Sequence, residues 1–158
     1  MAGVREESKP LAILDSNVIV YSMVMDYPNK TYHDKCFNLV ETGLKGELDY
    51  ILSINPIVVV EAFSALVRLL NWSQAEFRVS SFLHSKRIVF LSISKEVSEI
   101  SVQWAKEKEV PINDAMIGAN MIEMAALVYT VDEKHFKRLK EYGVKFVNPI
   151  KSWHNTSS

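Results

Sequence analysis

The sequence predicts an α/β domain with three layers, α/β/α, in which a central, mostly parallel five-stranded sheet lies between helices. Five short apolar runs rich in β-branched residues are typical of strands. Because each run is apolar nearly throughout and does not alternate, we expect the strands to be covered on both faces, as in a parallel sheet. The segments between the runs carry apolar residues at helical spacing, which predicts that helices separate the strands.

The predicted strands are followed by predicted helices, mostly in pairs, in the order β-α-α-β-α-α-β-α-α-β-α-β. The strands are residues 11–14, 50–54, 88–93, 127–131 and 145–147. Asn55 followed by Pro56 is typical of a helix N-cap with proline in the first turn, and it predicts a helix over 56–70. Ser73 is the candidate N-cap of the next helix. Further helices are expected over 94–108, 113–126 and 134–142, the last ending at Gly143.

Length, charge and cysteine content exclude several classes of protein. The 158 residues are expected to form one domain over 10–151, between a flexible tail over 1–9 and a polar tail over 152–158. The formal net charge of -1 is unlike that of a general nucleic-acid coat, so nucleic-acid contacts have to be local. Cys36 is the single cysteine, which leaves no disulfide and no cysteine-based zinc site. We expect a cytoplasmic protein without a membrane span.

Three aspartates are predicted to meet at one edge of the sheet. Asp15 directly follows the first strand and Asp132 follows the fourth, and sites in open parallel sheets form at the carboxyl ends of the strands. Asp114 lies in the first turn of a helix whose N-terminus faces the same edge if the crossover is right-handed. Each aspartate also has a purely structural explanation, because aspartate is a favoured helix N-cap and complements the helix dipole.

Glu61 is the acid that packing explains least. It follows three valines in the helix predicted over 56–70, where an unpaired carboxylate is unfavourable. Neither residue four positions away is a Lys or Arg, so the usual helical partner is missing. Carboxylates without a Cys or His cluster favour Mg²⁺ or Mn²⁺, which also accept water and phosphate oxygens. The four acids together predict phosphoryl chemistry with a metal-activated water and no protein nucleophile.

These residues resemble the motifs of the PIN-domain nuclease family, which includes the VapC-type toxins of toxin–antitoxin pairs. The family's first strand, ending in Asp-x-Asn, is similar to Leu-Asp-Ser-Asn-Val-Ile-Val-Tyr at 14–21, and its mid-helix Glu is similar to Glu61. Its Asp-Ala helix start is similar to Asn-Asp-Ala-Met-Ile-Gly-Ala-Asn at 113–120, and its strand-end Asp to Asp132. The resemblance covers nearly the whole chain, and four motifs in the family's order make it specific.

The resemblance implies a PIN-like fold and a metal-dependent endoribonuclease that leaves a 5′-phosphate. It implies that Mg²⁺ or Mn²⁺ is held by four acids, Asp15, Glu61, Asp114 and Asp132, and that Asn17 orients their carboxylates through hydrogen bonds. It further implies a homodimer and, for a toxin, a small antitoxin partner.

Two details of the motifs around Asp132 stay open. Phe136 comes one position later after Asp132 than is usual in the family, so either Asp132 or Glu133 could be the fourth acid. Asp132 is favoured because it ends the strand. Thr130 is a candidate supporting residue, since its hydroxyl could donate to Asp132 or to the scissile phosphate, although threonine is also a good strand residue.

Basic residues after Asp132 are the candidate substrate contacts. Lys134 and His135 lie closest to it in sequence, and Arg138 follows in the same predicted helix. These side chains could contact the phosphates of RNA. The alternative is that the run is only the solvated face of an amphipathic helix.

Other functions fit parts of this pattern. A haloacid-dehalogenase-like phosphatase needs a second Asp two positions after the first, where this chain has Asn17. A receiver-like signalling domain needs an acidic pair near the first loop and a Lys after the last strand, and neither is evident. A catalytically inactive PIN-like module that binds RNA or a partner would lack one or more of the carboxylates. An RNA-maturation nuclease would share the site and differ in its RNA.

Overall fold

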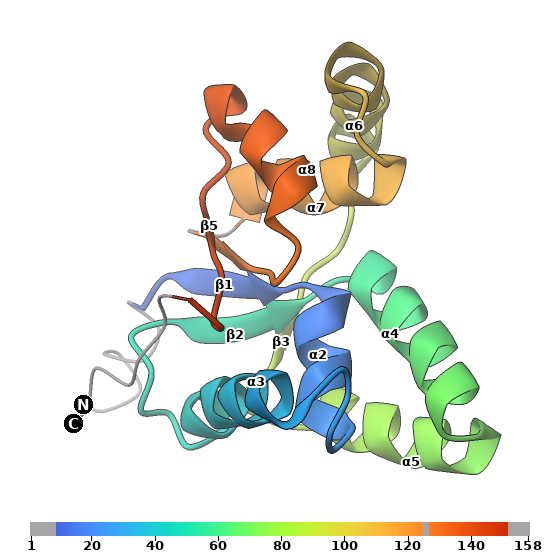
Figure 1. Ribbon diagram of the computed structural model, residues 1–158. Helices are drawn as coiled ribbons and strands as arrows, with labels where there is room; N and C mark the ends of the chain where they lie inside the picture. Colours follow the sequence, from blue (N-terminus) through green and yellow to red (C-terminus); the bar gives the residue numbers. More distant parts are fainter. Residues whose placement is uncertain (1–8, 125–126, 152–158) are drawn as a thin grey trace.

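The computed structural model describes residues 9–124 and 127–151, and these residues form a parallel sheet with helices on both sides (Figure 1). The strands are β1 (Leu11–Leu14), β2 (Ile51–Ile54), β3 (Val89–Phe90), β4 (Leu127–Tyr129) and β5 (Phe146–Val147). They lie in the order β3-β2-β1-β4-β5, and every neighbouring pair is parallel. The predicted three-layer α/β fold with a five-stranded sheet is confirmed.

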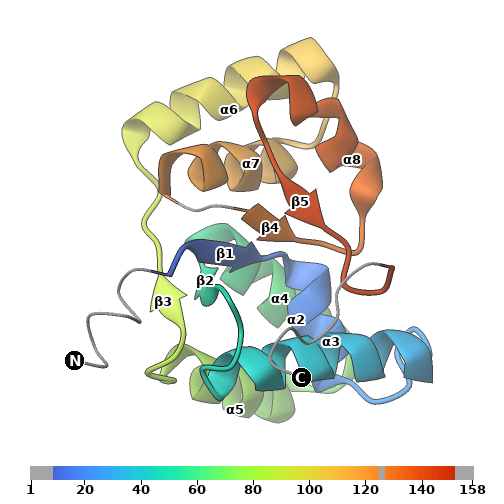
Figure 2. The same ribbon diagram turned by 90° about the vertical axis from the view of Figure 1, so that its left-hand side faces the viewer.

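The helices form two groups with the sheet between them. They are α2 (Ser16–Met23), α3 (Lys30–Leu44), α4 (Pro56–Leu69), α5 (Trp72–Leu83), α6 (Lys95–Lys108), α7 (Ile112–Met124), α8 (Glu133–Arg138) and the 3₁₀ turn η1 (Lys140–Tyr142). Both views place α6, α7 and α8 on one side of the molecule and α2, α3 and α5 on the other (Figures 1 and 2). The predicted order of elements is confirmed, with the helix expected over 134–142 divided into α8 and η1.

Side-chain caps fix where the helices begin. Asn55 accepts a hydrogen bond from the Val58 N–H at 3.0 Å, as its position before Pro56 predicts. Asn71 accepts from the Gln74 N–H at 2.8 Å, so the prediction that Ser73 caps this helix is wrong. Asparagine is as good an N-cap as serine, and Asn71 comes first after α4 ends, so α5 begins at Trp72.

The edge strand β3 is shorter and less covered than predicted. Only two of the six residues expected over 88–93 are assigned to the strand, and Phe90 is 54% exposed. After the hydrogen bond from the Leu91 N–H to the Ile54 carbonyl at 2.7 Å, the chain runs toward α6. The expectation that every strand is covered on both faces is therefore wrong for β3, which lies at an edge of the sheet and leaves the Phe90 side chain exposed.

Helix α7 packs close to its neighbours and is tied to the start of α4. A Cβ on Gly118 would lie 3.1 Å from Leu139 Cδ1 and 3.2 Å from Val144 Cγ2, so only glycine permits this approach without displacing a neighbour. The buried amide of Asn55 donates to Asn120 Oδ1 at 3.0 Å, and Asn120 Nδ2 donates to the Ser92 carbonyl at 3.2 Å. These contacts fix the position of α7, and with it the residues of its first turn, relative to β2 and α4.

Most of the predicted tails, 1–9 and 152–158, lies outside the described residues. Lys9 is the exception, and its Nζ donates to the carbonyls of Gly46 and Leu48 at 3.2 and 2.9 Å. The single-domain boundaries stay a prediction. None of the helices in the described ranges is long and apolar enough to cross a membrane.

Candidate metal centre

Asp15 lies between the two central strands and is held there by a hydroxyl. Its backbone N–H donates to the Tyr129 carbonyl of β4 at 2.9 Å, and its side chain is 4% exposed. One carboxylate oxygen accepts from the Ser16 N–H at 2.8 Å, which makes Asp15 the N-cap of α2, and the other accepts from Thr130 Oγ1 at 2.7 Å. Asp15 is therefore both a helix cap and a buried acid at the carboxyl edge of the sheet.

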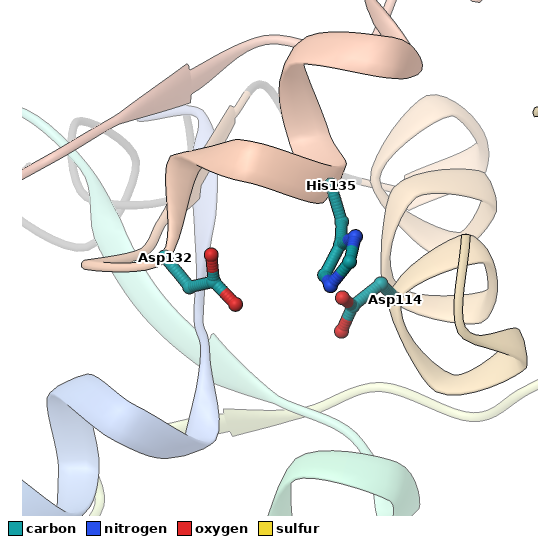
Figure 3. Close-up of side chains that lie close together, drawn as sticks. All are labelled: Asp114, Asp132 and His135. Atoms are coloured by element: carbon teal, nitrogen blue, oxygen red, sulfur yellow. The ribbon is translucent and has the colours of Figure 1, made fainter. Parts of the chain in front are cut away.

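Asp114, Asp132 and His135 lie together next to that edge. Ligand atoms of the three side chains lie within 4.8 Å of one another (Figure 3). Asp114 comes from the first turn of α7, Asp132 from the residue before α8, and His135 from α8 itself. Asp132 also caps α8, since its Oδ1 accepts from the Lys134 N–H at 3.3 Å. Its carboxylate is exposed, whereas Asp114 and His135 are half-buried.

Glu61 is positioned by a residue to which the sequence analysis assigned no role. Asn113 Nδ2 donates to Glu61 Oε2 at 2.9 Å and so joins α4 to the first turn of α7. The amide supplies the polar partner that no Lys or Arg provides on α4 itself. The signal for it was its place directly before Asp114, because one helix turn then presents an amide and a carboxylate to the same edge.

Burial and neighbouring charges raise the pKa of two carboxyl groups of the site, Asp15 and Asp114. Burial raises the pKa of Asp15 from 3.8 to about 7, the charges of Asp114 and Glu61 add to this rise, and the bonds from Thr130 and Ser16 oppose it. Burial also raises the pKa of Asp114 to about 7, followed by the charges of Glu61 and Asp132. Asp15, Glu61, Asp114 and Asp132 therefore act as one electrostatic cluster, although they come from four segments of the chain.

Glu133 is engaged outside this cluster. Its Oε2 lies 2.6 Å from Lys151 Nζ and accepts from Asn148 Nδ2 at 3.0 Å. These two partners hold the pKa of Glu133 below its usual value. Between the two acids that the sequence left open, the geometry favours Asp132 as the member of the acidic cluster.

Thr130, Asn17 and Arg138 have partners that differ from the predicted ones. The hydroxyl of Thr130 donates to Asp15 and accepts from the Asp132 N–H at 3.1 Å, so it fixes the strand end and does not donate to the Asp132 carboxylate. Asn17 was expected to orient carboxylates, but its Oδ1 accepts from the Val131 N–H at 3.2 Å.

Arg138 was expected to contact substrate, but its Nη1 donates to the Lys108 and Glu109 carbonyls at 3.4 and 3.2 Å. A guanidinium placed there satisfies the last carbonyls of α6, which otherwise lack donors. Lys134 is exposed on α8.

The donor set fits a hard divalent cation. Three aspartates and one glutamate offer oxygen atoms, and ion pairs between described residues involve none of them. His135 Nδ1 is buried without a hydrogen-bond partner among the described residues, next to two of the carboxylates. Carboxylates suit Mg²⁺ and Mn²⁺, and a bound cation would offset the mutual repulsion that raises the pKa of Asp15 and Asp114.

Several solved structures share this fold at low sequence identity. VapBC2 from Rickettsia felis, bound to a promoter DNA fragment, is 22% identical with a TM-score of 0.65, over 87% of this chain and 98% of that one. VapC20 from Mycobacterium tuberculosis, a toxin that cleaves the sarcin-ricin loop, is 15% identical with a TM-score of 0.65, over 80% and 93%. FitAcB from Neisseria gonorrhoeae is 21% identical with a TM-score of 0.62, over 90% and 100%.

Comparison with known sequences gives the family directly. No curated protein sequence matches the chain. The profile of the PIN domain matches residues 12–142, which is most of the chain and includes every acid of the cluster. The chain belongs to the PIN domain family.

Proposed function

We propose that this protein is a metal-dependent endoribonuclease. Asp15, Glu61, Asp114 and Asp132 would hold Mg²⁺ or Mn²⁺, and the substrate is RNA. The observation that carries the proposal is the convergence of Asp114, Asp132 and His135 within 4.8 Å, beside the buried Asp15. Structural packing alone gives no reason for carboxylates from four segments to gather, since each raises the free energy of the others.

The proposed reaction is hydrolysis of a phosphodiester. The oxygen of a water forms a bond to phosphorus, the bond to the 3′ oxygen breaks, and that oxygen takes a proton, which leaves a 5′-phosphate and a 3′-hydroxyl. The divalent cation supplies Lewis-acid chemistry when bound, because it favours ionisation of water and offsets phosphate charge. The protein supplies fixed carboxylates, with Thr130 holding Asp15 and Asn113 holding Glu61.

His135 and Lys134 would approach the phosphate from α8. His135 lies within 4.8 Å of the two aspartates, close enough to hold a proton or donate to a phosphate oxygen at the same place. Arg138 is left out of this proposal because α6 engages its guanidinium. Asn17 would act as a positioning residue, because its Oδ1 accepts from the Val131 N–H directly before Asp132.

The test is cleavage of fluorescently labelled single-stranded RNA with Mg²⁺ or Mn²⁺. We expect EDTA and Asp114→Asn each to abolish cleavage, while Asp34→Asn retains it. Asp34 is a matched control because it is an exposed acid that pairs with Lys30 on α3, away from the cluster. Cleavage that survives both EDTA and Asp114→Asn would contradict the proposal. Metal binding without cleavage of any RNA would support the inactive-module alternative.

We further propose that the protein is the toxin of a toxin–antitoxin pair. Support comes from solved structures with this fold, which include VapBC from Salmonella typhimurium bound to DNA and a toxin-antitoxin complex from Klebsiella pneumoniae. The test is co-expression with the protein encoded by a neighbouring short reading frame. Growth arrest by this chain alone, relieved by co-expression, is the expected result. Cleavage without growth arrest would favour RNA maturation.

Homodimer formation and a cytoplasmic location are part of the same proposal. Two exposed aromatic side chains on α5, Trp72 at 67% and Phe77 at 71%, are candidate dimer contacts. Light scattering of the full chain and of Trp72→Glu tests this. A dimer that the substitution dissociates is expected, and a monomeric parent protein would contradict it.

A further inference from the structure

A groove leads away from the acidic cluster along α2 and α4. It has a volume of about 470 Å³, and it is lined by Asn17 and Glu61 at one end and by Arg68 at the other, with Tyr21 and Tyr27 beside them. We call this the α2–α4 groove. Its volume lies within the range of about 300–1,000 Å³ that is typical of small-ligand sites, so it has room for a nucleotide.

Helix α4 places a cation at a fixed distance from the cluster. Arg68 follows Glu61 by two helical turns, so both side chains lie on one face of α4, about 10 Å apart along the helix. Between them on that face come Ser64 and Ala65, whose small side chains leave the groove open. Arg68 is exposed, and its guanidinium makes no hydrogen bond or ion pair to another described residue.

Tyrosine side chains form the α2 side of the groove. The Tyr27 ring is 39% exposed and packs on Tyr21 with ring centroids 5.7 Å apart. Tyr21 in turn contacts Tyr32 of α3, edge to face, at 5.7 Å. The loop that carries Tyr27 ends at Asn29, whose side chain accepts from the Tyr32 N–H at 3.0 Å and caps α3. Tyr27 is thus an exposed ring held in place by two buried or half-buried neighbours.

An exposed aromatic ring beside an unpaired guanidinium is the chemistry that binds unpaired nucleotides. Bases stack on aromatic rings when they are not paired, and arginine contacts the neighbouring phosphate. Arg68 is the one cation among the described residues that line the groove, and Glu61, the acid of the cluster that lines it, lies two helical turns away. A strand whose scissile phosphate sits at the acids would therefore bring its next nucleotide along Tyr27 toward Arg68.

We propose that the α2–α4 groove binds single-stranded RNA, with an unpaired base on Tyr27 and a flanking phosphate on Arg68. This rests on the proposed nuclease function and assigns Tyr27 and Arg68 as two substrate contacts outside the acidic cluster. Tyr21 is a positioning residue for Tyr27. An extended protein segment in the groove is the competing occupant, and charge and continuity with the acidic cluster favour RNA.

The experiment measures binding and cleavage separately with the full chain. Binding of a fluorescein-labelled, unstructured RNA is measured by anisotropy in EDTA over a range of salt concentrations, and cleavage of the same RNA is measured with Mn²⁺. The variants are Arg68→Ala and Tyr27→Ala, with Lys106→Ala on the exposed face of α6 and Tyr27→Phe as matched controls. The same RNA annealed to its complement serves as the duplex probe, and light scattering reports the oligomeric state of each variant.

We expect both variants to weaken single-strand binding by at least about fivefold, the lower range for loss of a stacked base. Arg68→Ala should also reduce the salt slope by about 0.7, the value for one phosphate contact on a single strand, and Tyr27→Ala should not. With Mn²⁺ both should raise KM with little change in kcat, because the contacts are made before and during the reaction. Lys106→Ala and Tyr27→Phe should behave like the parent protein.

Several results would overturn the proposal. The first is that the parent protein shows no detectable binding of single-stranded RNA in EDTA. The second is that both variants bind and cleave like the parent protein. The third is that the duplex binds as tightly as the single strand and that the two substitutions weaken both equally. A change of oligomeric state in Arg68→Ala or Tyr27→Ala would assign the groove to protein. If the variants lose binding but the parent cleaves no RNA with either metal, the groove proposal is supported and the nuclease proposal fails.

Discussion

Replacing Asp15 with asparagine should stabilise the metal-free protein while abolishing cleavage. Burial and neighbouring charges raise the pKa of Asp15 from 3.8 to about 7. A shift of about three pKa units means that, above neutral pH, the ionised carboxylate lowers the free energy of unfolding by about 4 kcal/mol. An amide of the same shape carries no charge, so Asp15→Asn removes this penalty.

The gain is smaller than 4 kcal/mol because hydrogen bonds change. The carboxylate accepts from both Ser16 N and Thr130 Oγ1, whereas an amide has a single oxygen. The pKa of about 7 already includes both of these bonds to the charged form, so what reduces the gain is the amide NH₂ group: one proton can face the Thr130 hydroxyl, and the second needs an acceptor in a buried site, which costs about 2 kcal/mol. A net gain of about 2 kcal/mol then raises Tm by about 4–8 °C for a domain of this size.

Thermal unfolding in EDTA at several pH values is the assay. The penalty that the substitution removes should be full above about pH 7.5 and vanish toward about pH 4, where Asp15 of the parent protein is protonated in both the folded and the unfolded state. Asp34→Asn, which removes an exposed acid, is the control and should change Tm little. A variant that is less stable at every pH, or a gain that does not depend on pH, would refute the reasoning and assign Asp15 a purely structural role as the cap of α2.

Four further outcomes test the same site. In EDTA the parent protein should lose stability as pH rises from about 4 to about 7, because Asp15 and Asp114 bind protons more tightly folded than unfolded; chemical denaturation checks this, and stability that rises over this range would contradict it. Thr130→Val should move the acidic limb of the pH–rate profile upward, since Asp15 loses a donor to its charged form. Mn²⁺ at about 100 times its Kd should add about 2.7 kcal/mol to stability, and Glu61→Gln should need more metal for the same Tm shift. Arg138→Ala should cost about 1 kcal/mol in denaturant unfolding and leave cleavage unchanged, because Arg138 caps α6 and does not contact the acids.

The elements and the location of the acids could be predicted because both depend on local pattern. An apolar run gives a strand, the residue after a central strand lies at the carboxyl edge, and Asp15 and Asp132 follow from that rule. The same pattern does not say which strand is at an edge. The residues over 88–93 are as apolar as those of central strands, yet β3 lies at the edge of the sheet and its Phe90 is exposed.

The partners of the acids could not be predicted because they are distant in sequence. Thr130 and Asp15 are separated by 115 positions, and Asn113 and Glu61 by 52. Hydrophobic periodicity carries no information on such pairs, since a hydroxyl or amide at a strand or helix end is compatible with many folds. Only the register of β1 with β4, and the bond from Asn55 to Asn120 that ties α7 to the start of α4, bring these groups within hydrogen-bond distance.

The cations show how nearness in sequence can mislead about nearness in space. Arg138 comes six residues after Asp132, but α8 carries it to the C-terminus of α6, where the carbonyls of Lys108 and Glu109 engage it. Arg68 is 64 residues away from Asp132, and the geometry of α4 brings it into the groove that begins at Glu61. A polyanion approaching four carboxylates needs cations that are free to contact phosphate; Lys134 on α8 and Arg68 on α4 are exposed and can meet that need, whereas α6 engages Arg138. The side of the acidic cluster formed by α2 and α4 is therefore the side from which we expect RNA to enter.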